Sequence, residues 1–166
     1  KAKFVCSGCL GEGFCGEECF KTSLASHLPG CGIDFEATTS AAVSRVGRTI
    51  AENATLAIGG ESSCWICLES GSEERPLYHA GCACRGTAGF GHEACFAKAA
   101  RVDPRLVQCT ICEQPTVGFL QLVMLDALRR QGNAAALGQL AVVLAISGES
   151  VVALRIAQRE YVATKR

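Results

Sequence analysis

The segments C-W-I-C (64–67), C-A-C-R-G-T-A-G-F-G-H-E-A-C (82–95) and C-T-I-C (109–112) decide the fold of this chain. Together they hold seven cysteines and one histidine in four close pairs, separated by fourteen, seven and thirteen residues. The members of each pair are close enough in sequence for both side chains to reach one ion. Eight such ligands are the number that two tetrahedral zinc ions require. We therefore predict two structural zinc sites without an open coordination position.

The four pairs can be joined to two ions in more than one way. If the first and third pairs share one ion, and the second and fourth share the other, the chain is cross-braced into one compact unit. Few large apolar residues lie between the ligands, so zinc would supply much of the folding free energy, at an apparent ~10–16 kcal/mol per site. This pairing gives Cys64, Cys67, His92 and Cys95 for one zinc and Cys82, Cys84, Cys109 and Cys112 for the other.

The cysteine content raises the choice between disulfides and metal. Twelve cysteines in 166 residues are more than soluble domains usually carry. The start of the chain, K-A-K-F-V-C-S-G-C, has neither the apolar core nor the cleavage site of a signal peptide. The C-x2-C spacing favours metal over a secreted disulfide scaffold. We therefore expect a cytoplasmic or nuclear protein in a reducing compartment.

Charge and hydropathy exclude two further classes of function. Lys plus Arg equals Asp plus Glu at 16 each, so no basic excess indicates a nucleic-acid partner. The most apolar run, 134–146, is interrupted by Gly138 and Gln139. It is shorter than the ~18–20 residues that a membrane-spanning helix needs. We expect no nucleic acid and no membrane span.

The segment from Cys82 to Cys95 resembles the RING-CH (variant RING) finger of the MARCH-type ubiquitin ligases. That family shows C-x-C, then a basic residue, Gly, and Ser or Thr, and then H-x2-C; Arg85-Gly86-Thr87 fill the middle places. The resemblance covers about residues 63–115. A PHD finger shares the ligand order, but it has a shorter gap before its histidine and an aromatic residue where this chain has Val107. These spacings favour RING-CH over PHD.

The resemblance implies an E3 ubiquitin ligase that forms no covalent intermediate. Such a finger has no catalytic residue of its own; it binds a ubiquitin-charged E2 conjugating enzyme and positions its thioester for a substrate lysine. RING-type fingers place an apolar residue inside the first cysteine pair, where this chain has Ile66. The neighbouring Trp65 is a second candidate E2 contact, or else a shield for its zinc site, and Pro115 is a third.

Two departures from the family keep an alternative open. Many RING-CH fingers carry a tryptophan soon after the sixth ligand, where this chain has Phe96 and then Ala97-Lys98-Ala99-Ala100. Active RING fingers often place a cation directly after the last ligand, and Glu113 has the opposite charge. The alternative function is a non-catalytic zinc-finger scaffold that binds proteins. A PHD-like peptide reader is the third reading, and it would need an aromatic cage.

A second cysteine cluster lies at the amino terminus, within residues 1–33. Its later part, F-C-G-E-E-C followed by H-L-P-G-C, resembles a MYND zinc finger, a module that often takes proline-containing peptides; the alternative is a zinc knuckle that only stabilises the amino terminus. The first C-x2-C of that family would precede Lys1, so we expect the chain to be a piece of a longer protein. The family's pairing implies a third zinc on Cys6, Cys9, His27 and Cys31, and leaves Cys15 and Cys19 as a half site whose partners are missing.

Between and after these fingers the sequence predicts helices. Residues 34–62 read as a linker in which Val43, Val46 and Ile50 recur at helical spacing. We expect Thr38-Thr39-Ser40 to cap that helix and Gly59-Gly60 to end it. The remaining histidine, His79, is interpreted as a loop residue rather than a ligand.

Residues 116–166 form the predicted helical tail. Apolar positions recur from Phe119 to Leu128, Gly132-Asn133 interrupts them, and further helices are expected at about 134–146 and 150–164. The pair of later helices resembles a tetratricopeptide hairpin, carried by Leu140, Ala141, Leu144, Gly148, Ala153 and Leu154. Arg155 and Arg159 are expected on a solvated helix face. The predicted fold is thus a set of small zinc-stabilised α+β modules, a partial MYND-like finger and a cross-brace RING-CH finger, followed by an α-helical tail.

Overall fold

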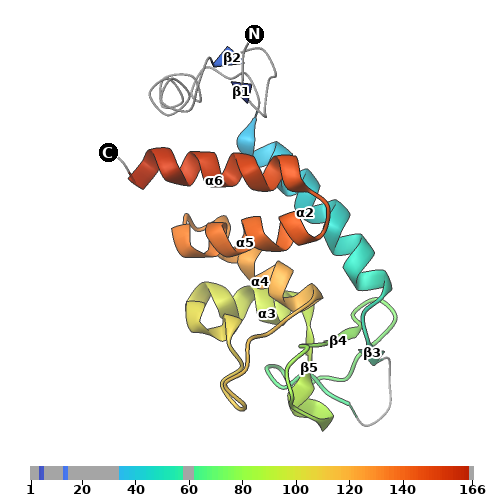
Figure 1. Ribbon diagram of the computed structural model, residues 1–166. Helices are drawn as coiled ribbons and strands as arrows, with labels where there is room; N and C mark the ends of the chain where they lie inside the picture. Colours follow the sequence, from blue (N-terminus) through green and yellow to red (C-terminus); the bar gives the residue numbers. More distant parts are fainter. Residues whose placement is uncertain (1–3, 6–12, 15–33, 58–61, 165–166) are drawn as a thin grey trace. The chain divides into compact units, whose positions relative to one another are not determined.

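The computed structural model describes residues 4–5, 13–14, 34–57 and 62–164 (Figure 1). The chain divides into two compact units, one of residues 43–137 and the other of residues 1–42 together with 138–166. Near the amino terminus, strands β1 (Phe4–Val5) and β2 (Gly13–Phe14) pair antiparallel. The cysteines and the histidine of the predicted MYND-like finger lie outside the described residues.

Helix α2 (Phe35–Glu52) occupies most of the segment that the sequence presented as a linker. The predicted helix is present, but its predicted cap is wrong. The Asp34 carboxylate accepts the N–H of Ala37 at 2.9 Å, so Asp34 caps the helix. Thr39 is fully buried inside the helix. The helix ends at Glu52, before the predicted stop at Gly59-Gly60, and Gly59-Gly60 lies outside the described residues.

A small antiparallel sheet follows, in the order β3-β4-β5. Its strands are β3 (Leu56–Ala57), β4 (Leu77–His79) and β5 (Phe90–His92). Leu77 pairs with both Ala57 and His92 and is fully buried. The sheet therefore fixes His92 at a defined register, directly before the helix that carries the next ligand.

Helices α3 (Glu93–Val102) and α4 (Phe119–Arg129) pack against each other and supply the apolar core of the 43–137 unit. Phe96 and Ala100 on α3 are buried, as are Leu120 and Leu122 on α4. Two short 3₁₀ turns, η1 (Gly86–Gly89) and η2 (Pro104–Val107), lie in the connections of the finger. The core thus rests on the helices and the sheet, while the cysteine-bearing loops add little apolar burial.

The carboxyl-terminal region is helical, as the sequence predicted. Helix α5 (Ala134–Ile146) and helix α6 (Ser150–Thr164) have the predicted bounds, and Gly148 between them adopts a φ of 89°. Leu140, Leu144 and Ile156 are fully buried. Leu154 is 52% exposed, although the tetratricopeptide resemblance gave it an apolar repeat position.

Of the two arginines of α6 expected on a solvated face, Arg159 is exposed, with 54% of its side chain accessible, whereas Arg155 is buried, which corrects the expectation for Arg155. Arg155 is only 6% exposed. The Arg159 guanidinium lies 4.2 Å from the centre of the Phe35 ring and 3.9 Å from the Glu36 carboxylate. A cation over an aromatic face adds roughly 0.5–1 kcal/mol at such partly exposed sites.

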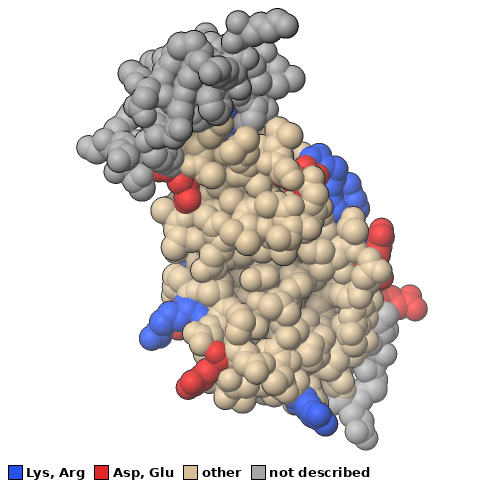
Figure 2. Space-filling model, viewed as in Figure 1, with Lys and Arg blue, Asp and Glu red and all other residues tan. Residues whose placement is uncertain are grey.

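Charged side chains are scattered singly over the face of the molecule in Figure 2 and do not gather there into a basic patch. Among the described helices, none has both the length and the apolar character that crossing a membrane would require.

Candidate metal centre

The first predicted ligand group is brought together in the structure. The ligand atoms of Cys64, Cys67, His92 and Cys95 all lie within 4.8 Å of one another. The Nδ1 atom of His92 is 3.3 Å from the Cys67 sulfur and 3.9 Å from the Cys95 sulfur. Zn–S and Zn–N bonds of about 2.3 and 2.0 Å in a tetrahedron place neighbouring ligand atoms roughly 3.5–3.8 Å apart. The group therefore has the size of a zinc site.

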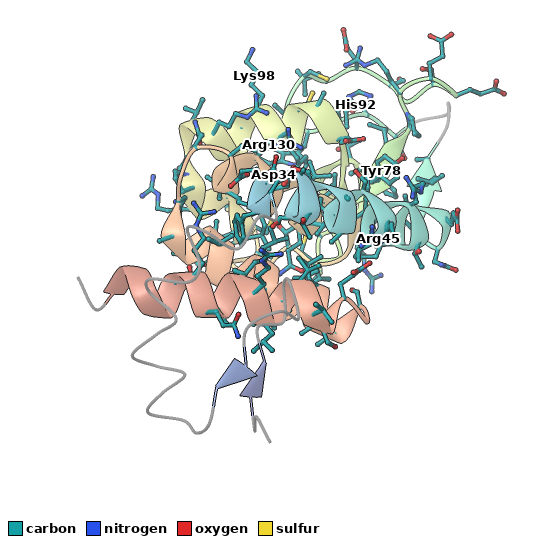
Figure 3. All side chains as sticks on the ribbon, turned by 90° about the horizontal axis from the view of Figure 1, so that it is seen from above. Asp34, Arg45, Tyr78, His92, Lys98 and Arg130 are labelled. Carbon is teal, nitrogen blue, oxygen red and sulfur yellow. The ribbon has the colours of Figure 1, made fainter. Side chains whose placement is uncertain are left out.

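His92 presents its Nδ1 atom to the two sulfurs and is 2% exposed (labelled in Figure 3). Its other ring nitrogen, Nε2, is buried and has no hydrogen-bond partner among the described residues. Because a metal-bound imidazole must be neutral, Nε2 would carry the ring proton. No described residue accepts a hydrogen bond from Nε2, so strand β5 and helix α3 set the orientation of the ring.

Strand β5 and helix α3 position the histidine and its partner cysteine. His92 ends β5 with extended backbone and stands at the cap position of α3, so Cys95 falls in the first turn of that helix. Residues three apart on a helix share one face, which lets both side chains reach the same ion. Phe96 packs beneath, and a Cβ atom at Gly91 would collide with its ring. Gly91 is therefore required by this close approach.

The second predicted ligand group is also assembled. The sulfurs of Cys82, Cys84, Cys109 and Cys112 lie within 4.8 Å of one another, with Cys84 and Cys109 at 3.6 Å. Only Cys82 of this group is buried. Its four cysteines lie outside the named strands and helices, so loops alone carry this cluster.

The first and last cysteine pairs form two turns with the same hydrogen bonds, which we call the first knuckle (64–69) and the second knuckle (109–114). In the first knuckle, the N–H of Leu68 donates to the Cys64 carbonyl at 2.7 Å, and the Cys64 N–H donates to the Glu69 carbonyl at 2.8 Å. In the second, Glu113 and Cys109 make the equivalent bonds at 2.9 and 2.8 Å. Both turns also end in an isolated antiparallel bridge.

The residue after each knuckle's second cysteine adopts left-handed backbone. The φ angles are 64° at Leu68 and 57° at Glu113. Side chains other than glycine rarely adopt this conformation, because Cβ approaches the backbone. The shared strain and shared bonds indicate that both knuckles are built for the same task, which is to hold two sulfurs on one side of the turn.

The two clusters alternate along the chain, which is the cross-brace arrangement that the sequence allowed. The loop of the second pair is tied to the second knuckle, because the Ala83 N–H donates to the Gln114 side-chain oxygen at 2.9 Å. The Val117 N–H donates to the Ala80 carbonyl at 3.0 Å and joins the chain after the finger to its centre. Loss of either cluster therefore affects segments far apart in sequence.

The thiols of each cluster do not share one acidity. A hydrogen bond from the Gln114 backbone, which outweighs the effect of burial, lowers the pKa of Cys112 to about 6. Burial and the neighbouring thiols raise the pKa of Cys84 and that of Cys95 to about 12. Four crowded sulfurs cannot all ionise unless a cation compensates their charge. Zinc supplies that cation, and the two clusters are positioned to bind zinc ions.

One ion pair beside the first cluster was not predicted from the sequence. A Glu69 carboxylate oxygen lies 3.7 Å from the Cys67 sulfur and 3.0 Å from the Arg75 guanidinium. Arg75 thereby compensates a carboxylate that stands next to a metal-binding sulfur. Both side chains are more than half exposed, so the pair contributes little to stability.

The residues predicted to contact an E2 enzyme differ in exposure. Pro115 is exposed, whereas Ile66 and Trp65 are half-buried. The Trp65 ring stands edge-on to Phe96 with 6.0 Å between ring centres, so it also covers the core beside the first cluster. Their role as E2 contacts stays a prediction.

The sequence analysis missed two exposed apolar side chains on the knuckles. Leu68 is 76% exposed and Ile111 is 58% exposed. Ile111 has the same place in C-T-I-C as Ile66 has in C-W-I-C, so the repeated motif could have indicated it. Leu68 carries no comparable signal in the sequence.

The sequence also predicted ligands in the amino-terminal segment and a non-ligand role for His79. Cys6, Cys9, Cys15, Cys19, His27 and Cys31 lie outside the described residues, so the third zinc site stays a prediction. His79 is in neither cluster, and it ends strand β4 rather than lying in a loop. Its Nδ1 atom accepts the Gly81 N–H at 3.0 Å, and its ring packs edge-on against Phe90.

Comparison with known proteins gives one match. The family model described as the RING-variant domain matches residues 64–112, from the first cysteine of the first knuckle to the second cysteine of the second. No curated protein and no solved structure matches the chain. Residues 64–112 thus carry a RING-variant zinc-finger domain with both of its ligand groups in place.

Proposed function

We propose that the protein is a RING-CH E3 ubiquitin ligase, which holds a ubiquitin-charged E2 enzyme for transfer to a substrate lysine. The observation that carries this proposal is the RING-variant match over two interleaved Cys/His clusters. RING-type domains typically bind E2 enzymes.

Transfer in this proposal proceeds directly from the E2 to the lysine. All seven cysteines in the described part of the chain belong to the two clusters. This part of the chain therefore offers no spare thiol to accept ubiquitin. Four ligands would also fill the coordination sphere of each zinc, which would leave no position for Lewis-acid chemistry. The finger would act by positioning the thioester and favouring a reactive conformation.

The proposed E2 contact consists of apolar side chains near the two knuckles. Ile66 and Trp65 belong to the first knuckle, Ile111 belongs to the second, and Pro115 directly follows it. Ile111 and Pro115 are exposed, and Ile66 and Trp65 are half-buried. Accessible apolar side chains on rigid turns make good contact residues, because little conformational entropy is lost on binding. Zinc keeps both turns rigid.

A discharge assay tests this proposal. The full zinc-loaded chain is mixed with a panel of ubiquitin-charged E2 enzymes and free lysine. At least one E2 should lose ubiquitin faster, and Ile66→Ala should reduce that acceleration about tenfold or more. Ile146→Ala is the matched control, since Ile146 is 80% exposed on α5, outside the finger, and it should discharge E2 like the parent.

The alternative is a non-catalytic zinc-finger scaffold, and Glu113 favours it. This carboxylate is exposed at the end of the second knuckle, where an active RING finger often has a cation. A negative group cannot donate the hydrogen bonds that a cation there would make. Under the ligase proposal, Glu113→Arg should raise the discharge rate. If neither parent nor Glu113→Arg discharges any E2, while both retain their zinc, the scaffold is the better account.

The remaining parts of the chain would choose the target in either case. We propose that the MYND-like segment takes a peptide ligand and that the helical region, with its tetratricopeptide-like hairpin, supports protein interaction. The finger's thiolate ligands suit a reducing compartment, so we propose a cytoplasmic or nuclear location.

A further inference from the structure

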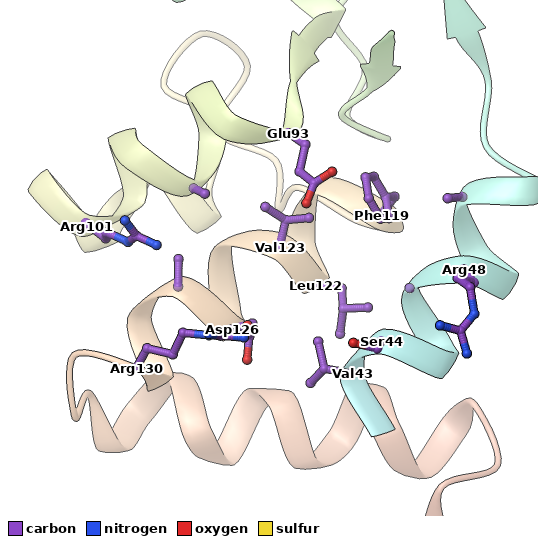
Figure 4. A pocket seen from close by; sticks show the side chains of 14 residues that line it. Val43, Ser44, Arg48, Glu93, Arg101, Phe119, Leu122, Val123, Asp126 and Arg130 are labelled. Carbon is purple, nitrogen blue, oxygen red and sulfur yellow. Dashed lines mark hydrogen bonds and ion pairs between the residues drawn. The ribbon is translucent and has the colours of Figure 1, made fainter. Parts of the chain in front are cut away.

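Within the 43–137 unit, helices α3 and α4 and the later part of α2, from Val43 onward, enclose a groove that the metal centre does not use. Its volume is about 490 Å³, within the range of roughly 300–1,000 Å³ typical of ligand sites. Figure 4 shows side chains from α2, α3 and α4 converging on it. The groove is therefore built from one element before the zinc ligands, one between them and one after them.

The middle of the groove is lined mainly by apolar side chains, with the Glu93 carboxylate beside Val123 and Phe119 (Figure 4). Val43 on α2 and Leu122 and Val123 on α4 face the space, with Phe119 at one side (Figure 4). Leu122 is 1% exposed and forms the floor. A Cβ atom at Gly47 would lie 3.6 Å from the Leu122 side chain, so α2 runs close above that floor. This lining suits aliphatic side chains of an incoming segment.

The ends of the groove carry an excess of positive charge. Arg48 lies at one end, and Arg101 and Arg130 lie at the other (Figure 4). Asp126 is already used, because its carboxylate pairs with Arg130 at 2.8 Å and with the buried Arg129 at 2.8 Å. Among the described residues, Arg48 and Arg101 make no ion pair, and Glu93 is the one unpaired carboxylate of the lining.

We propose that this groove binds an acidic, apolar peptide segment of a partner protein. Aliphatic side chains would fill the space over Leu122, and carboxylates at either side would reach Arg48 and Arg101. Arginine suits this role, since its planar guanidinium binds a carboxylate through two parallel hydrogen bonds. Binding does not require ligase activity, so this proposal and the proposed function fail separately.

The test is selection from a display library of random 12-residue peptides on the full zinc-loaded chain. Enriched peptides should combine carboxylates with two or more aliphatic residues. The enriched peptides are labelled with fluorescein, and their binding is measured by fluorescence anisotropy. They should bind more weakly at about 0.5 M salt than at about 0.05 M, because the screening length falls from about 13 to about 4 Å. Arg48→Glu and Arg101→Glu should each weaken binding about tenfold or more.

Two further variants separate the groove from general charge effects. Lys98→Glu makes the same charge change on α3, but Lys98 does not line the groove and points outward in Figure 3. It should change affinity less than about twofold. Ser44→Trp fills the groove from an exposed position of α2 and should abolish binding. Circular dichroism and zinc content establish that each variant is folded.

Four results would overturn the proposal. The first is that no peptide is enriched over a denatured-chain control, and the second is that basic or uncharged peptides are enriched. The third is that the Arg48→Glu and Arg101→Glu variants bind the selected peptides as tightly as the parent chain does. The fourth is that sedimentation shows a dimer of the parent chain that these two variants dissociate. The last result would assign the groove to a second copy of this chain.

Discussion

The two metal clusters have matching knuckles but different surroundings. In the first, Cys64 is fully buried and His92 is 2% exposed, and the sheet, α3 and the Phe96 ring support them. In the second, Cys82 alone is buried, and loops carry all four cysteines. The first cluster is therefore part of the hydrophobic core, while the second organises loops that the core does not reach.

The largest difference is expected when one ligand is removed from each cluster. His92→Ala should cost both zinc ions of the finger and unfold it, because that site supplies on the order of 10 kcal/mol and joins β5 to α3. Cys84→Ser should cost one zinc but leave the sheet and α3 folded. Native mass spectrometry counts zinc relative to the parent, and fluorescence of Trp65, the sole tryptophan, reports the core. If Cys84→Ser also loses two ions and the Trp65 signal, the clusters do not differ as described.

A smaller effect is expected from the apolar residues beside each cluster. Phe96→Ala removes a 4% exposed ring and should lower the free energy of unfolding by about 3–5 kcal/mol. Ile111→Ala removes a 58% exposed side chain beside the second cluster and should change the free energy of unfolding by about 0.5 kcal/mol or less. Urea unfolding at saturating zinc measures both. Equal losses would mean that the second cluster has a core of its own.

The smallest difference between the two clusters is expected at the knuckles, where matching substitutions should have equal effects. Leu68→Val and Glu113→Val place a β-branched residue at a left-handed position, which should add on the order of 1 kcal/mol to the strain already present in each case. The control is Glu74→Val, at an exposed position without positive φ, which should cost less. A loss at one knuckle without a similar loss at the other would contradict their shared geometry.

The sequence predicted the parts of this molecule in which partners lie close together along the chain. Each cysteine pair spans a few residues, and zinc accepts few ligand types, so the eight ligands could be found from spacing. The bounds of α5 and α6 followed from Gly132-Asn133 and Gly148, because glycine marks helix ends.

The sequence did not predict features that depend on contacts between distant segments, or on which of two nearby residues caps a helix. Thr38-Thr39-Ser40 resembled a helix start, but Asp34 made the capping bond earlier in the chain. The two residues of β3 are too few to show strand periodicity. The groove joins α2, α3 and α4, and Arg155 is buried despite its charge, so neither has a signature in a single segment.

The ligand pairs alternate between two sites of different composition, one with three sulfurs and a nitrogen and one with four sulfurs. Substitution by cadmium-113 followed by NMR tests it directly, because the chemical shift depends on the number of sulfur ligands. We predict that Cys67→Ser and His92→Cys perturb one finger resonance, and that Cys84→Ser and Cys109→Ser perturb another. A single resonance that responds to both Cys67→Ser and Cys84→Ser would contradict the alternating arrangement.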